Sequence, residues 1–348
     1  MKKTATIKDI ALHLQISAAT VSRALRDHPH ISDERKAAVW KTAREMNYQP
    51  DTVAQSLKRG STQTIGVIVP AIKYHFFSQA LDGIEEVAFK SGYTVLVCKS
   101  NESHDREVVN AETLASNRVA GIIVSLAQDS RDTDHFANLM QRNVPVVFFD
   151  RVPEKLKAPK VVGDDYEAAY ALTEHLIQRG YRRIAHLAGP EALLISRRRI
   201  KGYRDALKKH GLATPPAYLI HGGLEEEDGR REAAKLLALR PRPDAVFAVN
   251  DPVALGVYQA CKEAGIRIPE DLAVAGFSDN PISALLNPPL TTIAQPAYEL
   301  GAAAAKMLLE RIQEGTPAKS DLEVCRSRLI IRESTPERRA GTLSSPND

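Results

Sequence analysis

TIKDIALHLQISAATVSRAL, residues 6–25, decides the fold of the N-terminal part of the chain. Thr6 is a residue type that caps helices, and the apolar residues that follow it recur at helical spacing. Ser17 can cap a second helix in the same way. The expected buried stripe of the second helix is Val21, Ala24 and Leu25. Two short helices joined by a tight turn have the geometry of a DNA-reading helix-turn-helix, with an ordinary helical hairpin as the alternative.

The outward face of the second helix carries small and polar side chains. Small residues at its start let the backbone approach base edges, and an arginine farther along can donate two hydrogen bonds to guanine. The DNA-binding residues expected from the helix pair are Thr6, Ser17, Ala18, Ala19, Thr20, Ser22 and Arg23.

A third helix is predicted from Ser32 to about Met46, because Ser32 can cap it and acidic residues in its first turn suit the helix dipole. We expect its apolar packing from Ala37, Ala38, Val39, Ala43 and Met46, with Trp40 as the one bulky aromatic residue. Arg35 or Lys36 could contact phosphates. A supporting role is favoured, because three short helices need each other to close a small core.

Four segments carry a resemblance to a known family: TIKDIA and SAATVSRAL, then YQP and VAQSLKRG downstream. They are similar to the N-terminus of the LacI/GalR (lactose/galactose-repressor) family, and the similarity continues through nearly the whole chain. The resemblance implies a sequence-specific transcriptional regulator, most often a repressor, controlled by a small, carbohydrate-related effector. It also implies a homodimer that places two recognition helices in successive major grooves of near-palindromic double-stranded operator DNA.

The segment 50–61 resembles the hinge helix and linker of this family, which is ordered only on operator DNA. The positions implied to contact the minor groove are Val53, Ala54 and Leu57. Leu57 falls where the family has an apolar wedge that unstacks a base step and bends the duplex, with a plain linker leucine as the alternative. Asp51 departs from the Asn or Ser of many members. Its carboxylate should weaken phosphate contacts yet suits the first turn of a helix, and which effect is larger stays open.

From Thr64 onward, short apolar strands alternate with amphipathic helices. The strand-like runs are 64–69, 93–97, 121–126, 144–149, 183–189, 244–251 and 272–279, with helical segments such as 78–91 and 166–179 between them. Near-continuous apolar strands separated by helices imply parallel sheets covered on both faces. The predicted fold class is therefore an all-α helix-turn-helix head followed by an α/β core of two doubly wound parallel-sheet subdomains.

This core resembles the periplasmic-binding-protein type I fold that the family carries. In that fold the chain crosses between the two halves, here near Asp164 and again near Thr292, with a late strand at 328–332. The expected domains are 1–49 for the head, 50–61 for the hinge helix and linker, 62–335 for the effector-binding and dimerisation core, and 336–348 for a flexible tail. The tail lacks a leucine heptad, so we expect no coiled-coil tetramer.

Ligands of such folds gather at the carboxyl ends of the parallel strands. The effector-binding residues expected from position are Phe76, Phe77, Asp150, Arg199, Asn250, Asp251, Ser278 and Asp279. Arg199 opens RIKGY, which resembles the R-x-x-G-aromatic motif of the family, and Asn250-Asp251 resembles its ND pair. The structural alternatives are packing for the phenylalanines, a surface ion pair for the arginine, and helix caps for the Asn and Asp residues.

Ser278 departs from the family pattern, since members with sugar or purine effectors usually carry an acid directly after Gly-aromatic. A serine hydroxyl makes a weaker contact than a carboxylate, so the effector could differ from a simple hexose, or Asp279 could turn inward. Leu224 and Gly163 also stand where some relatives hold aromatic residues.

Composition limits the classes of protein to consider. The 348 residues suggest two or three domains and carry a net charge of +4. Residues 1–60 hold 11 Lys and Arg against 6 Asp and Glu, as expected of a DNA-binding head. The three scattered cysteines suit neither a disulfide framework nor a zinc site, and His28 and His30 bracket a proline without nearby Cys ligands.

Catalytic and cofactor motifs are missing from the sequence. There is no G-x-G-x-x-G after the first strand, no G-x-x-x-x-G-K loop and no G-x-S-x-G elbow. We therefore expect no catalytic residues, no cofactor and no metal. With no secretion signal and no apolar run of membrane-spanning length, a cytoplasmic chain without membrane contact is expected. The alternative is a solute-binding protein or a carbohydrate-handling enzyme on the same core.

Overall fold

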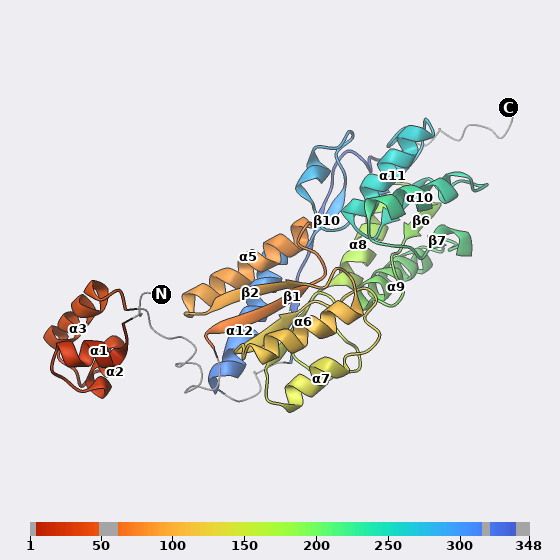
Figure 1. Cartoon of the computed structure of the whole chain (residues 1–348). Helices are drawn as coiled ribbons and strands as arrows, with labels where there is room; N and C mark the ends of the chain where they lie inside the picture. Colours follow the sequence, from red (N-terminus) through yellow and green to blue (C-terminus); the bar gives the residue numbers. More distant parts are fainter. Residues whose placement is uncertain (1–4, 49–61, 315–320, 339–348) are drawn as a thin grey trace. The chain divides into compact units, whose positions relative to one another are not determined.

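The computed structural model describes residues 5–48, 62–314 and 321–338 (Figure 1). The chain divides into two compact units, a head up to Thr62 and a core from Gln63 onward. Each unit is described by itself.

The head contains three short helices, α1 (Ile7–His13), α2 (Ala18–Leu25) and α3 (Asp33–Glu45). Thr6 and Asp9 form a capping box at α1, in which each side chain accepts from the backbone N–H of the other residue. Ser17 caps α2, since its hydroxyl accepts from the backbone N–H of Thr20 at 3.1 Å. Ser32 occupies the cap position of α3, but its side chain makes no capping hydrogen bond.

The head closes around a small apolar core contributed by all three helices. The side chains of Ile10, Val21, Ala24 and Val39 are fully buried. The predicted packing of α3 is wrong in part, because Ala37, Ala38 and Trp40 are exposed and Thr42 is buried instead. The reason is helical periodicity. Residues three and four positions after Val39 lie on the same buried face of α3, whereas its direct neighbours in sequence point elsewhere.

The first half of the core is a six-stranded parallel sheet in the order β11-β5-β4-β3-β1-β2. Its strands are β1 (Thr64–Val69), β2 (Thr94–Lys99), β3 (Gly121–Val124), β4 (Val146–Phe149), β5 (Lys160–Gly163) and β11 (Leu322–Cys325). Helices α5 (His75–Lys90) and α12 (Ala297–Glu314) cover one face, and α6 (His104–Ser116) and α7 (Asp134–Gln141) cover the other (Figure 1). Successive residues of β1, β3 and β4 face opposite helical layers, so these strands are apolar throughout.

The second half is a four-stranded parallel sheet in the order β7-β6-β8-β9. Its strands are β6 (Ile184–Leu187), β7 (Leu219–Ile220), β8 (Ala245–Ala248) and β9 (Ala273–Ala275). Helices α8 (Asp165–Gln178) and α9 (Leu194–Lys209) pack on one face, and α10 (Glu226–Leu237) and α11 (Asp251–Glu263) on the other. The 3-10 helices are η1 (Pro216–Tyr218) and η2 (Pro281–Ala284). A short antiparallel pair, β10 (Thr292–Ala294) with β12 (Arg328–Ile330), completes this half.

The chain crosses between the halves three times. It passes from β5 into α8, returns from β10 into α12, and passes again from β11 into β12. The fold class predicted from the sequence is confirmed, with crossings near Asp164 and Thr292 as expected. Strands β5, β7, β10 and β11 were not predicted, because they are short or carry polar residues at a sheet edge.

Candidate functional site

The exposed side of α2 is the first candidate site. Ala18, Ala19 and Arg23 are exposed on it, while Ser22 is half-buried. Within the described residues no hydrogen bond or ion pair engages the Arg23 guanidinium, so its donors face solvent. The small residues lie at the start of the helix and the arginine one turn later, as a helix entering a major groove requires.

Thr6, Ser17 and Thr20 serve the helix ends of the head. Thr6 is exposed and its hydroxyl donates to Asp9 Oδ2 at 2.7 Å, and the hydroxyls of Ser17 and Thr20 hydrogen-bond to each other at 2.8 Å. These three residues fix the helix starts and can still present hydroxyls outward. Val53, Ala54 and Leu57 lie outside the described residues.

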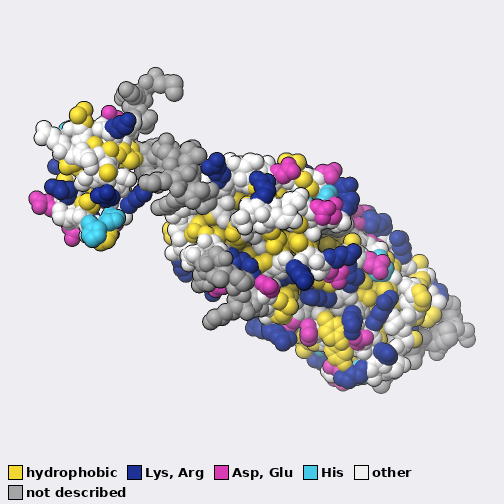
Figure 2. All heavy atoms as spheres, turned by 90° about the horizontal axis from the view of Figure 1, so that it is seen from below, with side chains coloured by type: hydrophobic (Ala, Val, Ile, Leu, Met, Phe, Trp, Pro, Cys, Tyr) yellow, Lys and Arg dark blue, Asp and Glu magenta, His cyan; other side chains and the backbone are white. Residues whose placement is uncertain are grey.

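Lys36 forms ion pairs within the head. Its ammonium pairs with Asp27 at 2.7 Å and with Asp33 at 3.4 Å, which ties α3 to the segment that follows α2. This agrees with the supporting role favoured for α3. Figure 2 shows Lys and Arg side chains on the visible face of the head, and on the core they recur among acidic and apolar ones.

The second candidate site is a cavity of about 70 Å³ between the two halves of the core. Its walls come from the start of α5, the loop after β4, helix α9 and the loops after β8 and β9. The lining residues are Tyr74, His75, Phe76, Phe77, Asp150, Arg151, Ile195, Arg199, Leu224, Asn250, Pro252, Ser278, Asn280 and Gln295. The carboxyl ends of strands from both sheets thus meet at one place, as expected for this fold.

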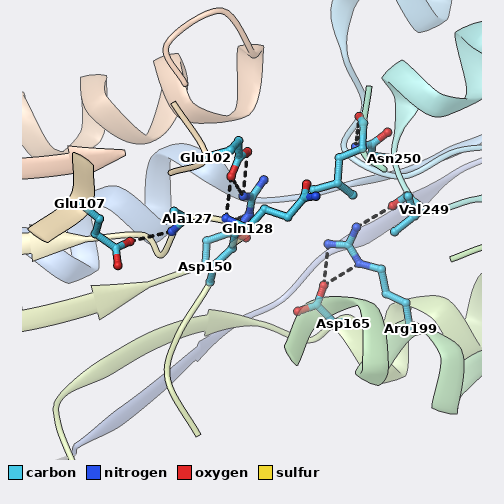
Figure 3. Close-up of polar contacts among 11 residues, drawn as sticks. Glu102, Glu107, Ala127, Gln128, Asp150, Asp165, Arg199, Val249 and Asn250 are labelled. Atoms are coloured by element: carbon cyan, nitrogen blue, oxygen red, sulfur yellow. Dashed lines mark hydrogen bonds and ion pairs between the residues drawn. The ribbon is translucent and has the colours of Figure 1, made fainter. Parts of the chain in front are cut away.

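Arg199 projects from α9 into this cavity and is buried (Figure 3). Its Nε and Nη2 donate to Asp165 Oδ1 at 2.9 and 2.7 Å, and Nη1 donates to the carbonyl of Val249 at 2.6 Å. The guanidinium also lies 3.7 Å from the centroid of the Phe277 ring, within cation–π distance. The charge of Arg199 is therefore compensated inside the protein.

Asp150 is the one cavity carboxylate, and it follows strand β4. Burial raises the pKa of Asp150 to about 7, against the opposing effect of the neighbouring Arg151. Arg151 itself donates to both carboxylate oxygens of Glu102, at 2.9 and 2.7 Å. Both cavity arginines therefore have carboxylate partners, while the buried Nε of Arg151 has no hydrogen-bond partner among the described residues.

Backbone strain accompanies the cavity on both sides. Asp150 has φ of 56° and Ser278 has φ of 130°, in a region that residues with a Cβ rarely adopt. Each follows the last residues of a strand, one in each half. Such conformations persist where surrounding structure enforces them and concentrate at functional sites.

Six of the eight effector-binding residues predicted from the sequence line the cavity: Phe76, Phe77, Asp150, Arg199, Asn250 and Ser278. Asn250 also caps α11, accepting from Val253 N at 2.8 Å and donating to the carbonyl of Leu224 at 2.9 Å. Phe77 is almost fully buried, so its ring packs in the apolar core and exposes little surface to the cavity.

The structure does not bring Asp251 and Asp279 to the cavity. Asp251 is buried and accepts hydrogen bonds from Asn280 N at 2.7 Å, Ser283 Oγ at 2.7 Å and Thr292 Oγ1 at 2.6 Å. Asp279 pairs with Arg332 at 2.7 Å. Asp279 therefore does not turn inward to replace the missing acid at Ser278, and Asp251 fixes the loops of the second half.

Sequence reasoning missed several lining residues. Tyr74 and His75 directly precede the predicted Phe76, and Arg151 follows the predicted Asp150, so proximity to a strand end was an available signal. Gln295 lies at the second crossing between the halves, which the sequence did locate approximately. Ile195 could be inferred only from its position one helical turn before Arg199.

Ion pairs join the two halves at the rim of the cavity. Glu225, the cap of α10, accepts from Lys73 Nζ at 2.7 Å and from the hydroxyl of Tyr74, both from the other half. A second pair joins Arg197 of α9 to Glu154 of the loop after β4. These contacts hold the two halves in the arrangement that the structure shows.

The described residues contain no cluster of three or more His, Cys, Asp or Glu that could hold a metal ion. None of the helices in that part of the chain has the length and apolar character needed to cross a membrane.

Two known protein families match this chain, one in the head and one in the core. The family described as "Bacterial regulatory proteins, lacI family" matches residues 6–51, and the "Periplasmic binding protein-like domain" matches residues 173–335. The HTH-type transcriptional repressor CytR of Escherichia coli (strain K12) is 36% identical over 332 residues, covering 95% of this chain and 96% of its own.

Two solved structures are similar over most of their length. The lac repressor dimer bound to operator and the anti-inducer ONPF has a TM-score of 0.85 at 27% identity, covering 96% of this chain and 100% of that one. A LacI family transcriptional regulator from Enterococcus faecium with bound ribose has a TM-score of 0.70 at 31% identity, covering 79% of this chain and 100% of that one.

Proposed function

The chain belongs to the lacI family of bacterial regulatory proteins, and from this premise we propose that it is a sequence-specific transcriptional repressor controlled by a small molecule. One observation carries the proposal. An exposed face of α2 with the required small residues and arginine stands in the same chain as a two-halved core with a cavity lined by aromatic and polar side chains. The family is one of regulators, and no catalytic role is proposed for the cavity.

The DNA partner is a near-palindromic double-stranded operator bound by a homodimer. Two copies would place their α2 helices in successive major grooves, because half-site spacing follows the symmetry of the protein. The structural similarity to a lac repressor dimer on its operator supports this arrangement. Exposed Phe89, Leu96, Ile282 and Leu285 offer the core apolar surface for a second copy.

The effector that suits the cavity is uncharged and rich in hydroxyl groups. Arg199 and Arg151 are paired with Asp165 and Glu102, so an anionic ligand would find no uncommitted cation. Asp150 can accept hydrogen bonds from hydroxyls, and Ser278, Asn280 and Gln295 supply further polar groups. We place a pentose or a nucleoside in this class, in line with the similar regulator that holds ribose.

Tyr74 and Phe76 add aromatic surface on the α5 side of the cavity. An aromatic face packs against the C–H groups of a sugar ring or stacks on a base, while the polar groups opposite fix its orientation. The effector would thereby contact both halves and bias the angle between them. A cytoplasmic location follows from the proposed regulatory role.

A DNA-binding titration tests the proposal. The full chain is titrated in phosphate-free buffer onto a pool of near-palindromic duplexes at two salt concentrations, with and without ribose or uridine. We expect sequence-selective, salt-sensitive binding that at least one of these uncharged ligands changes. Binding indifferent to sequence would overturn the repressor function, and a lack of response to both ligands would overturn the effector class.

A further inference from the structure

A second hollow, of about 410 Å³, lies between the halves and is separate from the effector cavity. Its walls are the loop 152–160, the strands β5 and β11, and helix α9. Leu194 and Arg198 of α9 line this hollow, whereas Ile195 and Arg199 line the effector cavity. Each pair is four residues apart, and successive residues of a helix differ by about 100° in direction. Two adjacent stripes of one helix therefore face two different sites.

The loop after β4 is shared in the same way. Asp150 and Arg151 line the effector cavity, and the residues directly after them, from Val152 to Glu154, line the second hollow. One loop from the first half and one helix from the second thus connect the two sites. A ligand held in the hollow would act on both elements.

The hollow has an excess of uncommitted positive charge. Lys157, Lys160 and Arg198 line it. Of its two acidic residues, Glu154 is paired with Arg197 and Asp321 with Arg311. In the described part of the chain neither Lys160 nor Arg198 forms an ion pair, and the Lys160 ammonium donates only to the carbonyl of Pro153.

Lys160 and Arg198 come from opposite halves and repel each other. Burial lowers the pKa of Lys160, and the positive charge of Arg198 lowers it further, against the opposing effect of Glu154. Repulsion between two cations from opposite halves is unfavourable, and an anion bound between them would reverse it. The planar guanidinium suits bidentate binding of a phosphate, and the ammonium supplies a point charge.

We propose that this hollow binds the phosphate group of a small phosphorylated metabolite, held between Lys160 of the first half and Arg198 of the second. Val152, Leu156 and Leu194 provide apolar surface for the carbon part of such a ligand. The bound anion joins the halves at a point separate from the effector cavity. The site is independent of the proposed function, since it rests on the charges and shape of the core alone.

Isothermal titration calorimetry on the full chain tests the site, at constant ionic strength with sodium chloride as balance. Inorganic phosphate and glycerol 3-phosphate are the probes, with glycerol as the uncharged control. We expect one saturable site per chain, tighter for glycerol 3-phosphate than for inorganic phosphate. Arg198→Gln and Lys160→Gln should each weaken binding at least tenfold. Lys155→Gln, an exposed change in the same loop that does not line the hollow, should leave it unchanged.

Two results of the titration would overturn the site itself, and a third would overturn the class of ligand. One is the absence of saturable binding beyond that of chloride. The other is equal binding by the wild type and by both hollow variants, which would locate phosphate elsewhere, for example on the basic head. Equal affinity for the two probes would limit the ligand to inorganic phosphate and overturn the assignment to a phosphorylated metabolite.

Thermal unfolding in phosphate-free buffer separates ligand binding from a structural role. Arg198 is half-buried and makes no hydrogen bond within the described residues, so removing its charge relieves repulsion with Lys160 and gives up an attraction to the buried Asp165 carboxylate. Because these two effects oppose each other, we expect Arg198→Gln to have a Tm close to that of the wild type, and to lose the Tm increase that phosphate gives the wild type. A markedly lower Tm without phosphate would show that Arg198 supports the fold, contrary to the proposal.

Discussion

Arg199 carries its charge in the interior of the core, where it depends on Asp165 and the carbonyl of Val249. A buried ion pair contributes little net stability, but removing one partner leaves an uncompensated buried charge. Asp150 presents the opposite case, a buried carboxylate with no hydrogen-bond donor among the described residues and only the charges of Arg151 and Arg199 as partial compensation. Substitution of either residue should therefore change the stability of the core as well as its binding of the ligand.

The first prediction concerns Arg199→Ala. It should destabilise the core by about 3–5 kcal/mol, because Asp165 is left buried without its partner. The effector should also no longer change DNA binding. Arg197→Ala is the matched control, since Arg197 lies two residues earlier in a partly exposed pair with Glu154 and should cost at most about 1 kcal/mol. Urea unfolding followed by circular dichroism measures both, and equal losses would contradict the buried role of Arg199.

The second prediction concerns the pH dependence set by Asp150. Its pKa rises from 3.8 to about 7 in the folded core, so between these values the folded chain keeps a proton that the unfolded chain releases. Stability from this group is therefore lost as the pH rises from about 4 to about 7. Asp150→Asn should be more stable relative to the wild type at pH 8 than at pH 5.

The measurement for Asp150 is the difference in Tm between variant and wild type at the two pH values. Burial lowers the pKa of His175 to about 4 and of His186 to about 3, which costs stability as the pH falls, but these effects cancel in the difference. Asp105→Asn, an exposed change on α6, is the control and should show the same difference at both pH values. A difference independent of pH in Asp150→Asn would contradict its raised pKa.

At the scale of elements, function depends on what the end of a strand or one face of a helix presents. Helix α2 buries Val21 and Ala24 and so exposes Arg23, because about 100° separates successive residues. Helix α10 places Glu225 at its cap, where it reaches across to Lys73 and Tyr74 of the other half. The same local rules of periodicity and capping thus set both the DNA-facing surface and the contact between halves.

The third prediction tests α2. Arg23→Ala should reduce discrimination at one base pair in each half-site by about 1–3 kcal/mol, because a bidentate contact to a base edge is lost. Arg35→Ala, at an exposed position of α3, is the control. It should change the affinity for all DNA sequences equally or not at all. Competition titrations against single-base operator variants measure this. A uniform loss on all sequences in Arg23→Ala would contradict a base-reading role.

The fourth prediction tests the contact between the halves. Glu225→Gln removes the negative charge that pairs with Lys73 and accepts from Tyr74, so this contact between the halves becomes weaker. Because the pair is about half exposed, the effect on effector affinity should be modest, about a fivefold change at most. Glu227→Gln, which affects only the pair with Arg230 on the same helix, should leave effector affinity unchanged. Calorimetric titration with the effector compares the two variants. Identical affinities would show that the Glu225 contact between the halves does not influence effector binding.

At the scale of the whole molecule, the head has a much smaller apolar core than the rest of the chain, and the proposed operator binding uses two copies. Its three helices bury only a few apolar side chains, whereas the core builds separate apolar clusters on both faces of each sheet. Association through the core would therefore place two heads on one operator. Exposed apolar residues of the second half, above all Leu285, are available for this.

The fifth prediction is that Leu285→Glu shifts the protein toward monomers. Leu285 is 83% exposed, so a charge there is harmless to a single chain but unfavourable in an apolar interface. Light scattering after size exclusion measures the mass, and DNA affinity should fall with it. Leu322→Glu, also at an exposed leucine but on the edge strand β11, is the control and should remain dimeric. A dimeric Leu285→Glu protein would place the interface elsewhere.

The sequence by itself determined the fold class and most of the elements in their order. Cap residues, helical spacing and apolar runs are local properties, so they located the helix pair of the head, the seven apolar strands and two of the crossings between halves. Strand-end positions, together with the family resemblance at Arg199 and Asn250, also brought six cavity residues into view, because parallel strands place their carboxyl ends at one edge. Short strands, polar edge strands and several lining residues next to the predicted ones, such as Tyr74 and Arg151, escaped this reasoning.

The tertiary structure alone decided which polar groups are committed to one another. Asp251 and Asn250 are adjacent in sequence, yet Asp251 turns into the second half while Asn250 lines the cavity. Arg198 and Arg199 are likewise adjacent, yet they face two different sites. The pairing of Arg199 with Asp165 and of Arg151 with Glu102 joins residues far apart in the chain. Charge compensation depends on distance and burial in space, which no local pattern encodes, so the chemistry of the cavity emerged only from the folded core.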